Sequence, residues 1–479
     1  MALRHGDRYQ LNFFPESIED YVSEDAAVRA YDVFADHLDL ADLGIVVDRI
    51  KAGCPEYSPL AMLKLLIYGY SYGIRSSRKL ERECNNNVSF IWLMGGLKPD
   101  HKTIARFRRN NKKALKKAIK QCAQLCIKLG LIDGNVLFVD GSKMRADASI
   151  SNSWTQAKCE AKLKQLDSLI DKLLKDCEST DQSEEGCGSL VHIEKQLKNK
   201  EAFRTKVSDI LKTLKESGRT SINTVDPDAL RQSGRQGSHA GFNMQGTADG
   251  KHGLLVNIDV VSANNDAAQL SEQAKQALDV LSIIERTPDS HVTVCADAGY
   301  AKYEDLQKTE SEDIEVVVPS QKQVSKKETG PFDKDKFVYD EEMDILVCPE
   351  GKVLSKSGIR NNGAEIIYRT DKGVCQACKH FGTCTKSTKG RMVKRYHFEA
   401  FKKMLETRYE TVKGQEIYKQ RKETIELIFG HIKRNLGAGH FLLRGLDGVR
   451  AEASLLGCVF NIRRMITIFG VKGLMNKLA

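Results

Sequence analysis

Two strand-like segments of this chain end on an aspartate, and this pattern limits the possible folds more than any other feature of the sequence. The stretch GNVLFVDGSKMRADAS (134–149) holds an apolar run that leads directly into Asp140. The stretch HVTVCADAGY (291–300) repeats the pattern and leads into Asp297. Apolar runs without alternation are typical of strands covered on both faces, so each carboxylate is expected at the edge of a packed sheet. Taken alone, an Asp-Gly pair such as 140–141 is equally compatible with a simple turn cap.

The segments around these aspartates follow one another in the order of a mixed α/β fold. A hairpin turn at Asp249-Gly250 joins two strand-like runs, the second of which is LLVNIDVV (254–261). A helix is predicted over 266–285, then the strand that ends at Asp297, a further helix and the strand IEVVVPS (314–320). Three strands, helix, strand, helix, strand predicts an α/β core with a mixed sheet.

Length and composition exclude several classes of protein. The chain has 479 residues, of which 41% are hydrophobic and 29% charged, and this length predicts two to four domains. No run approaches the ~20 apolar residues that a membrane-spanning helix needs, and the first twenty residues lack the apolar centre of a signal peptide. The thirteen cysteines are odd in number and mostly scattered, which favours a reducing compartment. We therefore expect a cytoplasmic protein without a membrane partner.

Helical and mixed segments alternate along the chain. Apolar positions at helical spacing dominate up to about residue 130, and two later amphipathic stripes predict an antiparallel helical hairpin. A Lys-rich and Cys-bearing section begins near residue 321, and the last section is again helical. The predicted parts are a helical N-terminal domain (1–130), a core in three segments (131–154, 222–320 and 396–479), a helical-hairpin insertion (155–221) and a cysteine-rich insertion (321–395).

The positive charge of the chain is concentrated in one block. The net charge is +10, and the stretch HKTIARFRRNNKKALKKAIK (101–120) carries nine Lys or Arg and no acid. It follows a helical segment and a Gly-Pro turn, a pattern compatible with a helix-turn-helix DNA reader and also with a plain helical bundle. A phosphate-contacting surface and a solvated helix face both remain open for this block. The candidate DNA contacts are Lys102, Arg106, Arg108 and Arg109.

The helical segment near the C-terminus has a third acid on a face adjoining its apolar stripe. In RKETIELIFGHIKR (421–434), the spacing of four residues places them on one face of a helix: Lys422, Glu426, Gly430 and Lys433. A carboxylate between two cations can belong to a phosphate-binding site or to ordinary salt bridges on a helix surface. The apolar stripe beside it is formed by Ile425, Ile428, Phe429, Ile432 and Leu436.

Four cysteines are spaced like the ligands of a structural zinc site. Cys348, Cys375, Cys378 and Cys384 form the pattern C-x26-C-x2-C-x5-C. Four thiolates suit tetrahedral Zn²⁺, and the alternative is a set of free thiols in a small core. We predict zinc, because this region is otherwise poor in large apolar residues.

In three of these stretches the chain resembles the DDE transposases of bacterial insertion sequences, which have a ribonuclease-H-like catalytic fold. The stretches are FVDGSKMRADAS, ADAGY and RKETIELIFGHIKR. The N-terminal segments SPLAMLKLLIYGYSYGIRSSRKLE and PDHKTIARFRR resemble the helical domain of the same branch. The resemblance covers nearly the whole chain. It implies a catalytic triad of Asp140, Asp297 and Glu426, which would hold two Mg²⁺ or Mn²⁺ ions for phosphodiester chemistry.

The same resemblance implies roles for neighbouring residues. Tyr418, Arg421 and Lys433 resemble the accessory residues around the family's glutamate. The usual spacing would place the Tyr and Arg at 419 and 422, which are both Lys here, so Glu423 remains a second candidate for the acid.

The implied function is transposition of a mobile element. Water first frees a 3′-hydroxyl at the element end, and the same site then joins that hydroxyl to target DNA. The implied partners are the terminal repeats and target DNA, with a homodimer or larger assembly in the bacterial cytoplasm, at the nucleoid. The alternatives are a ribonuclease-H-like DNA nuclease without strand transfer and an inactive, domesticated DNA-binding protein.

Overall fold

The computed structural model describes seven stretches of the chain and divides it into two compact units. The described residues are 17–45, 56–181, 187–234, 237–285, 291–325, 330–360 and 365–479. Unit 1 comprises Met1–Asp266, Lys275–Pro288 and Glu423–Ala479, and unit 2 comprises Ala267–Ala274 and Asp289–Lys422. Helices occur beside antiparallel strand pairs in unit 1 and beside both parallel and antiparallel pairs in unit 2. The predicted mixed α/β class is confirmed.

The N-terminal part of unit 1 is helical throughout its described residues. Its helices begin at local signals in the sequence: α3 has Pro59 in its first turn, and the Asp100 side chain accepts the Thr103 N–H at 2.7 Å to cap α6. The elements are η1 (Ile18–Tyr21), α1 (Ala27–Asp36), α2 (Leu40–Leu43), α3 (Pro59–Ser71), α4 (Ser77–Asn86), α5 (Val88–Leu93), α6 (His101–Asn110) and α7 (Lys112–Lys128).

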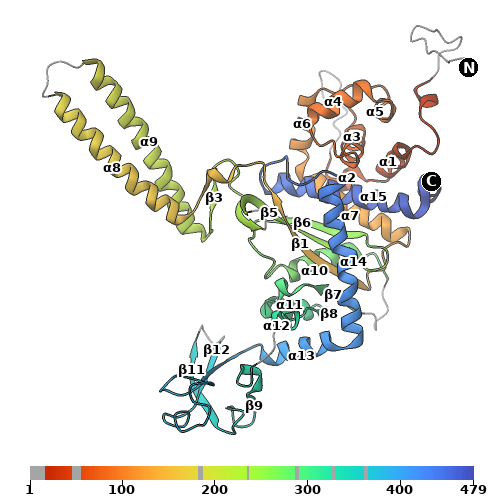
Figure 1. Ribbon diagram of the computed structural model, residues 1–479. Helices are drawn as coiled ribbons and strands as arrows, with labels where there is room; N and C mark the ends of the chain where they lie inside the picture. The colour runs from red at the N-terminus through yellow and green to blue at the C-terminus, as the bar shows by residue number, and fades with distance from the viewer. Residues whose placement is uncertain are drawn as a thin grey trace, which may run out of the picture. The chain divides into compact units, whose positions relative to one another are not determined.

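The C-terminal helix α15 (Leu446–Leu478) is the core around which unit 1 packs. It contacts α1, α3, α7 and the strand β6 (Figure 1). By length and composition alone α15 could cross a membrane, but half of its apolar window is buried inside the structure. Its apolarity is therefore that of a core helix.

The sheet of unit 1 is built around one long strand. β5 (Gly237–Asp249) pairs antiparallel along one edge with β1 (Val136–Arg145). Along its other edge, the two ends of β5 pair with β4 (Leu230–Gly234) and β6 (Leu255–Val261). Leu137, Phe138 and Val139, which precede Asp140 in β1, are fully buried, as the apolar composition of the run predicts.

A helical hairpin is inserted in the chain between β2 (Ser153–Trp154) and β3 (Ile222–Asn223), which pair with each other as a separate two-stranded sheet. It consists of α8 (Gln156–Asp181) and α9 (Cys187–Ser217), which run side by side (Figure 1). The turn between them, 182–186, and the side chains of 176–194 lie outside the described residues. The two helices are held together by a small apolar cluster of Cys159, Leu166, Val207, Leu214 and Ile222.

A buried ion pair joins the N-terminal helices to the C-terminal segment of unit 1. Arg75 and Glu452 are 4% and 0% exposed, and Arg75 Nη1 lies 2.6 Å from Glu452 Oε1. Glu452 Oε2 accepts the backbone N–H groups of Leu442 and Leu443 at 2.9 and 3.0 Å. A buried carboxylate that is paired and accepts additional hydrogen bonds has its desolvation largely offset.

The arginine of this pair also holds a loop in place. Its guanidinium donates to the carbonyl oxygens of His440 (2.7 Å) and Gly437 (2.9 Å). Arg108, itself 6% exposed, donates from Nη1 to the Arg75 carbonyl at 2.5 Å. The loop that leads into α15 is therefore fixed by charged side chains rather than by apolar packing alone.

Unit 2 contains a short parallel pair and a separate antiparallel sheet. β7 (Val292–Ala296) pairs in parallel with β8 (Ile314–Val317). The second sheet has the order β13-β12-β11-β10-β9 and a core that includes Leu354 and Tyr368. Its strands are β9 (Val338–Asp340), β10 (Ile345–Val347), β11 (Val353–Arg360), β12 (Glu365–Arg369) and β13 (Met392–Tyr396). The short helices of unit 2 are η3 (Ala298–Tyr300), α11 (Tyr303–Glu310), α12 (Gln321–Ser325) and η4 (Lys334–Lys336).

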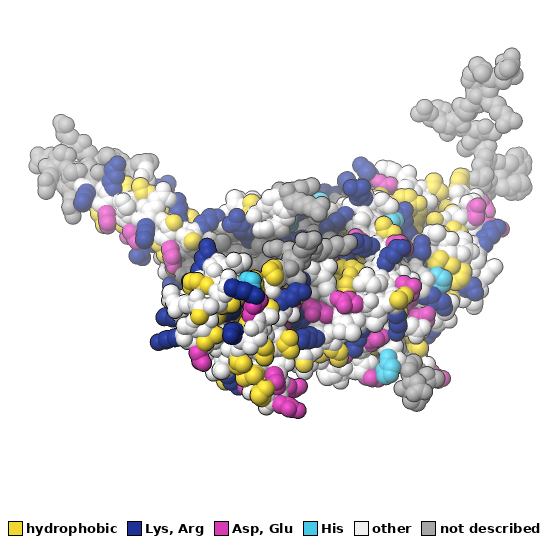
Figure 2. Space-filling view, turned by 60° about the horizontal axis from the view of Figure 1, so that its bottom comes forward, with side chains coloured by type: hydrophobic (Ala, Val, Ile, Leu, Met, Phe, Trp, Pro, Cys, Tyr) yellow, Lys and Arg dark blue, Asp and Glu magenta, His cyan; other side chains and the backbone are white. Residues whose placement is uncertain are grey.

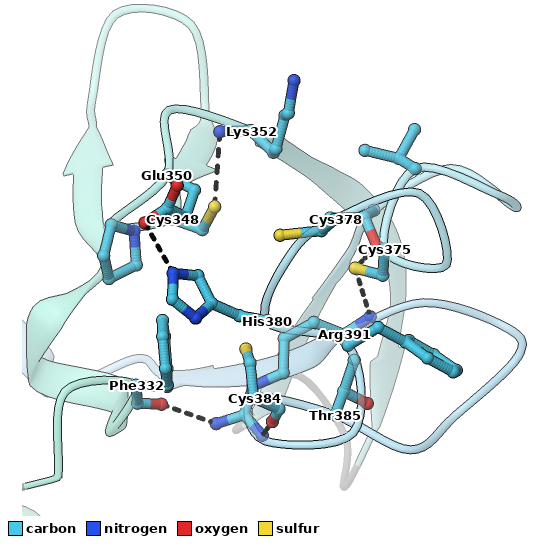
Figure 3. Close-up of a pocket in the computed structure, with 14 residues that line it drawn as sticks. Phe332, Cys348, Glu350, Lys352, Cys375, Cys378, His380, Cys384, Thr385 and Arg391 are labelled. Carbon is cyan, nitrogen blue, oxygen red and sulfur yellow. Dashed lines mark hydrogen bonds and ion pairs between the residues drawn. The ribbon is translucent and has the colours of Figure 1, made fainter.

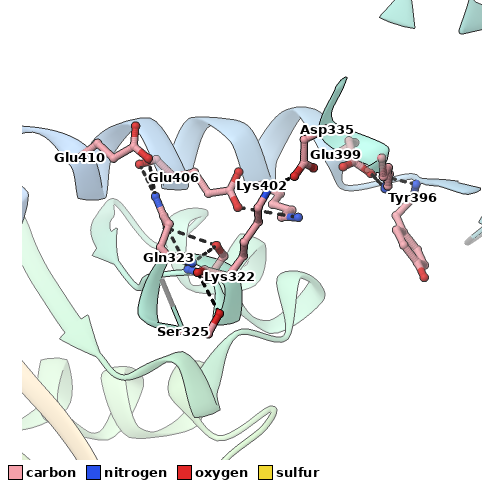
Figure 4. Close-up of polar contacts among 11 residues, drawn as sticks. Lys322, Gln323, Ser325, Asp335, Tyr396, Glu399, Lys402, Glu406 and Glu410 are labelled. Carbon is pink, nitrogen blue, oxygen red and sulfur yellow. Dashed lines mark hydrogen bonds and ion pairs between the residues drawn. The ribbon is translucent and has the colours of Figure 1, made fainter. Parts of the chain in front are cut away.

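Polar contacts attach α13 (Glu399–Glu410) to its neighbours in unit 2. Gln323 Nε2 of α12 donates to the Glu406 carbonyl and to Glu410 Oε1, both at 3.0 Å (Figure 4). Lys334 Nζ lies 2.6 Å from Glu399 Oε2. The helix α13 is thus fixed by hydrogen bonds at both its ends.

We predict that Glu452→Gln destabilises unit 1 by about 3–5 kcal/mol, because it leaves the buried Arg75 charge without its counter-ion. Asp167→Asn is the matched control: its partner Arg204 lies 2.5 Å away, but both side chains are about half exposed (48% and 50%). Breaking that pair should cost under about 1 kcal/mol. Thermal unfolding monitored by circular dichroism measures both. Equal shifts of Tm in the two variants would contradict the role assigned to the buried pair.

Candidate active site

Asp140 lies in the middle of β1, opposite Gly246 of β5. It is partly exposed, and its Oδ1 accepts the Gly141 N–H at 2.9 Å. A Cβ at position 141 would displace the side-chain ends of Gln245 and Asp266, so glycine lets these two side chains lie close to β1. The strand therefore continues past Asp140, and the Asp-Gly pair that could have capped a turn is part of β1.

A further acid of unit 1, Asp266, lies beside this strand and was missed by sequence reasoning. Two buried amides, Asn243 Nδ2 and Gln245 Nε2, donate to its Oδ1 at 2.8 and 2.7 Å. From sequence, Asp266 is simply the first residue of the predicted helix, but α10 (Leu270–Leu281) begins four residues later. Its position after a strand, in the polar run NND, is the one signal that could have drawn attention to it.

The helix α14 (Val412–Arg434) brings Glu426 to the level of Asp140 within unit 1. Ile425 and Phe429 pack on β5 at Gly246, whose Cβ, if present, would lie 3.6 Å from Ile425 Cδ1 and 3.2 Å from Phe429 Cζ. Gly246 is the register partner of Asp140. Glu426 follows Ile425 directly and is exposed. The apolar stripe predicted from the sequence is therefore the face that packs on the sheet.

Lys433 extends from the same helix to β1. Its Nζ donates to Ser142 Oγ at 2.6 Å and to the Lys143 carbonyl at 3.1 Å. Burial lowers the pKa of Lys433, and the nearby Asp140 carboxylate opposes that shift. An ammonium group two helical turns after Glu426 thus lies close to the aspartate of β1.

In unit 2, Asp297 follows the fully buried strand β7 and caps η3 (Ala298–Tyr300), accepting the Gly299 N–H at 2.8 Å. Arg421 lies near it. Burial raises the pKa of the Cys295 thiol to about 12, with the Arg421 charge opposing this and Asp297 adding to it. Arg421 is 5% exposed, and its Cζ lies 5.4 Å from the centre of the Tyr418 ring. Tyr418, Arg421 and Asp297 are therefore neighbours despite the one-residue shift from the family spacing.

The division between the units falls within α14, between Lys422 and Glu423. Asp140, Glu426 and Lys433 belong to unit 1, whereas Asp297, Tyr418 and Arg421 belong to unit 2. Glu423 is exposed like Glu426. One helix therefore carries candidate residues from both halves of the predicted site.

Three of the four basic candidates on α6 lie at the surface. Lys102, Arg106 and Arg109 are exposed, whereas Arg108 is buried beneath the helix and donates to the Arg75 carbonyl. The expectation that Arg108 contacts DNA is corrected accordingly: its guanidinium is part of the core. Lys and Arg side chains are also numerous on the face shown in Figure 2, in keeping with the net charge of +10.

The four clustered cysteines line one small cavity of about 30 Å³ in unit 2 (Figure 3). Cys375 Sγ accepts the Arg391 N–H and Cys348 Sγ accepts the Lys352 N–H, both at 3.3 Å. Burial raises the pKa of Cys384, and the three neighbouring thiols raise it further. The four sulfur atoms thus lie close enough together to influence one another electrostatically.

The four cysteines do not form a ready-made metal site. Within the residues that the structure describes, no group of three or more His, Cys, Asp or Glu side chains could hold a metal ion as placed. The cysteines have the donor type that zinc prefers, but binding it would require their side chains to rearrange.

Two parts of the chain match known protein families. Residues 347–466 match the transposase DDE domain, and residues 16–110 match a transposase domain designated DUF772. The first match includes α14 and the cysteine cluster, and the second includes α6. No curated protein and no solved structure matches the chain.

We predict that the exposed cations of α6 contribute to nucleic-acid affinity and that Arg108 contributes to stability. Replacing Lys102, Arg106 and Arg109 together by Gln should weaken DNA binding and flatten the slope of log K against log[salt] by up to about 2.7, because each lost phosphate contact contributes about 0.9. Arg108→Gln should instead lower Tm and leave that slope unchanged. Fluorescence anisotropy titrations at several salt concentrations measure the slope. An unchanged slope in the triple variant would remove α6 from the interface.

Proposed function

We propose that this chain, a DDE transposase of an insertion sequence, cleaves DNA at the ends of its element and transfers the freed 3′-hydroxyl to target DNA. The two family matches confirm the resemblance stated from the sequence. The observation that carries the proposed reaction is the position of α14. In unit 1 this helix crosses the sheet at the level of Asp140 and carries Glu426, and in unit 2 it carries Arg421 beside Asp297.

The proposed catalytic acids are Asp140, Asp297 and Glu426, which together would hold two Mg²⁺ or Mn²⁺ ions. Carboxylate oxygens are the ligands that these ions prefer. Glu426 lies on α14, which packs on β5 at Gly246, the register partner of Asp140. Bound there, two ions would activate the attacking water or hydroxyl and stabilise the leaving oxygen. Without a cation, three carboxylates brought together would repel one another.

The cations around these acids have a separate task. Lys433, which reaches β1 beside Asp140, would grip a phosphate next to the reacting group, and Arg421 with Tyr418 would do so beside Asp297. Arg421 is buried and Lys433 is partly buried, so their interaction with a phosphate is screened less than that of a fully exposed lysine. The helical domain (1–130) would add salt-dependent affinity through the exposed face of α6.

Two alternative functions each lack part of the transposition reaction. A ribonuclease-H-like nuclease would cut but not join DNA, and an inactive DNA-binding protein would do neither. The presence of all three acids argues against the inactive protein. Joining of a labelled 3′ end into a plasmid separates the remaining two. Synapsis of two element ends favours at least a homodimer on DNA, and we propose that the protein works in the cytoplasm, at the nucleoid.

We also propose that the cysteine-rich insertion (321–395) binds one structural Zn²⁺. The proposal rests on four thiols that line one cavity and on the backbone N–H groups of Lys352 and Arg391, which donate to two of the sulfur atoms. Zinc would supply a closed structural link between β10, β11 and the loop that carries the other three cysteines.

We predict that the three acids are needed for DNA cleavage and strand transfer but not for DNA binding. Asp140→Ala, Asp297→Ala and Glu426→Ala should each nearly abolish metal-dependent cleavage and strand transfer of a labelled element-end duplex. DNA affinity should survive, because carboxylates do not attract phosphate. Mg²⁺ or Mn²⁺ should support the wild type, and Ca²⁺ should allow binding with little turnover.

Glu423→Ala is the internal control for the register of α14. It should keep its activity, since Glu423 lies one turn before Glu426. Loss of activity in Glu423→Ala but not in Glu426→Ala would show that Glu423, and not Glu426, is the third catalytic acid. Cleavage by Asp140→Ala would refute the mechanism.

Zinc can be measured independently of activity. Elemental analysis of protein purified without added metal should find one zinc per chain, and Cys375→Ser with Cys378→Ser should lose it together with thermal stability. Cys159→Ala, in the hairpin cluster, should retain the metal. A zinc-free wild type of undiminished stability would exclude the site.

A further inference from the structure

Unit 1 contains a polar pocket of about 740 Å³ to which no role has been assigned above. One wall is the end of β1 with the segment that follows it, including Arg145, Asp147 and Ser149, and the other is the loop with His440 and Arg444. The pocket is wide and lined by side chains and backbone of mixed polarity, unlike the dry apolar pockets that take hydrophobic ligands.

The walls of this pocket are rigidly built. The Phe441 N–H donates to the Arg145 carbonyl at 2.8 Å, so the loop pairs with the last residue of β1. Behind the loop, Arg75 binds the His440 carbonyl. On the other side, the buried amide of Asn223 donates to the Ser149 carbonyl at 2.8 Å. The pocket therefore keeps its shape without a ligand.

The charged groups of the pocket favour an anion. Arg145 is exposed at its mouth, and Arg444, 54% exposed, pairs with Asp147 at 2.9 Å. Further cations lie near Arg145, as their common effect on His239 indicates. Burial lowers the pKa of His239, and the charges of Arg145, Lys143 and Lys433 lower it further. Asp147 is the one acid that lines the pocket among the residues described.

The pocket also lies on the strand that carries Asp140. Arg145 is five residues further along β1, which corresponds to about 17 Å at roughly 3.3 Å per residue. Arg145 is the last residue of β1, and because successive side chains of a strand alternate, it lies on the other face of the sheet from Asp140. A DNA strand held at Asp140 would therefore reach Arg145 past the end of β1, a few nucleotides from the reacting phosphate.

We propose that this pocket binds backbone phosphates of the DNA strand that is cut at Asp140, with Arg145 and Arg444 as the binding residues. The inference rests on the proposed function and extends it from the reacting phosphate to the path of the strand. Asp147 competes with phosphate for Arg444, so it limits the affinity of the pocket.

The test compares variants for binding, in the presence of EDTA, to a fluorescein-labelled duplex spanning the element end next to the coding frame. Arg145→Gln with Arg444→Gln should weaken binding about tenfold and flatten the salt slope by up to about 1.8, the loss of two phosphate contacts. Asp147→Asn should tighten binding, because it releases Arg444. Arg204→Gln is the matched control, since Arg204 is half exposed and paired with an aspartate as Arg444 is.

The position of the contact is tested by neutralising single phosphates of the duplex as methylphosphonates. Wild-type protein should lose affinity when one particular phosphate a few positions from the cut is neutralised, and the double variant should show no loss at that position. Unchanged binding by the double variant, or an equal loss in Arg204→Gln, would overturn the pocket. A wild type that binds but does not cut with Mg²⁺ would refute the proposed function alone, and a wild type that does not bind DNA would refute both.

Discussion

The packing of α14 across β1 and β5 is the interaction on which the candidate site of unit 1 depends. Ile425 and Phe429 can approach the sheet closely because position 246 of β5 has no side chain. The same contact fixes the rotation of the helix, so that Glu426 and Lys433 lie on its other faces, with Lys433 reaching Ser142. A bulkier residue at 246 would lift the helix and move the acid and the ammonium group together.

The loop before α15 depends on a different kind of force. Four backbone groups of this loop bind the charged ends of Arg75 and Glu452, which are both buried. Hydrogen bonds to buried charges have strict geometry, whereas apolar packing tolerates small shifts. This explains how an irregular segment can form one wall of a polar pocket and still pair with the end of β1.

Much of the fold could be predicted from the sequence because its signals are local. Uninterrupted apolar runs indicate the buried strands that lead to Asp140 and Asp297, and helical spacing indicates the face of α14 that packs on β5. Arg108 shows the limit of such reasoning. It belongs to a run of cations that looks like a uniform surface, and only the tertiary partner Arg75 reveals that one of them points inward. Asp266 was missed for the same reason, since the amides that orient it come from a strand over twenty residues away.

The buried ion pair has a consequence for how these proteins can be recombined. Arg75 lies in the segment that matches one transposase family, and Glu452 lies in the segment that matches the other. A chimera in which only the N-terminal helices or only the C-terminal segment of this chain is replaced has to restore both partners of this pair. If only one is inherited, an uncompensated charge remains in the core of unit 1. The two segments can therefore be exchanged only as a matched set, although more than three hundred residues separate the two side chains along the chain.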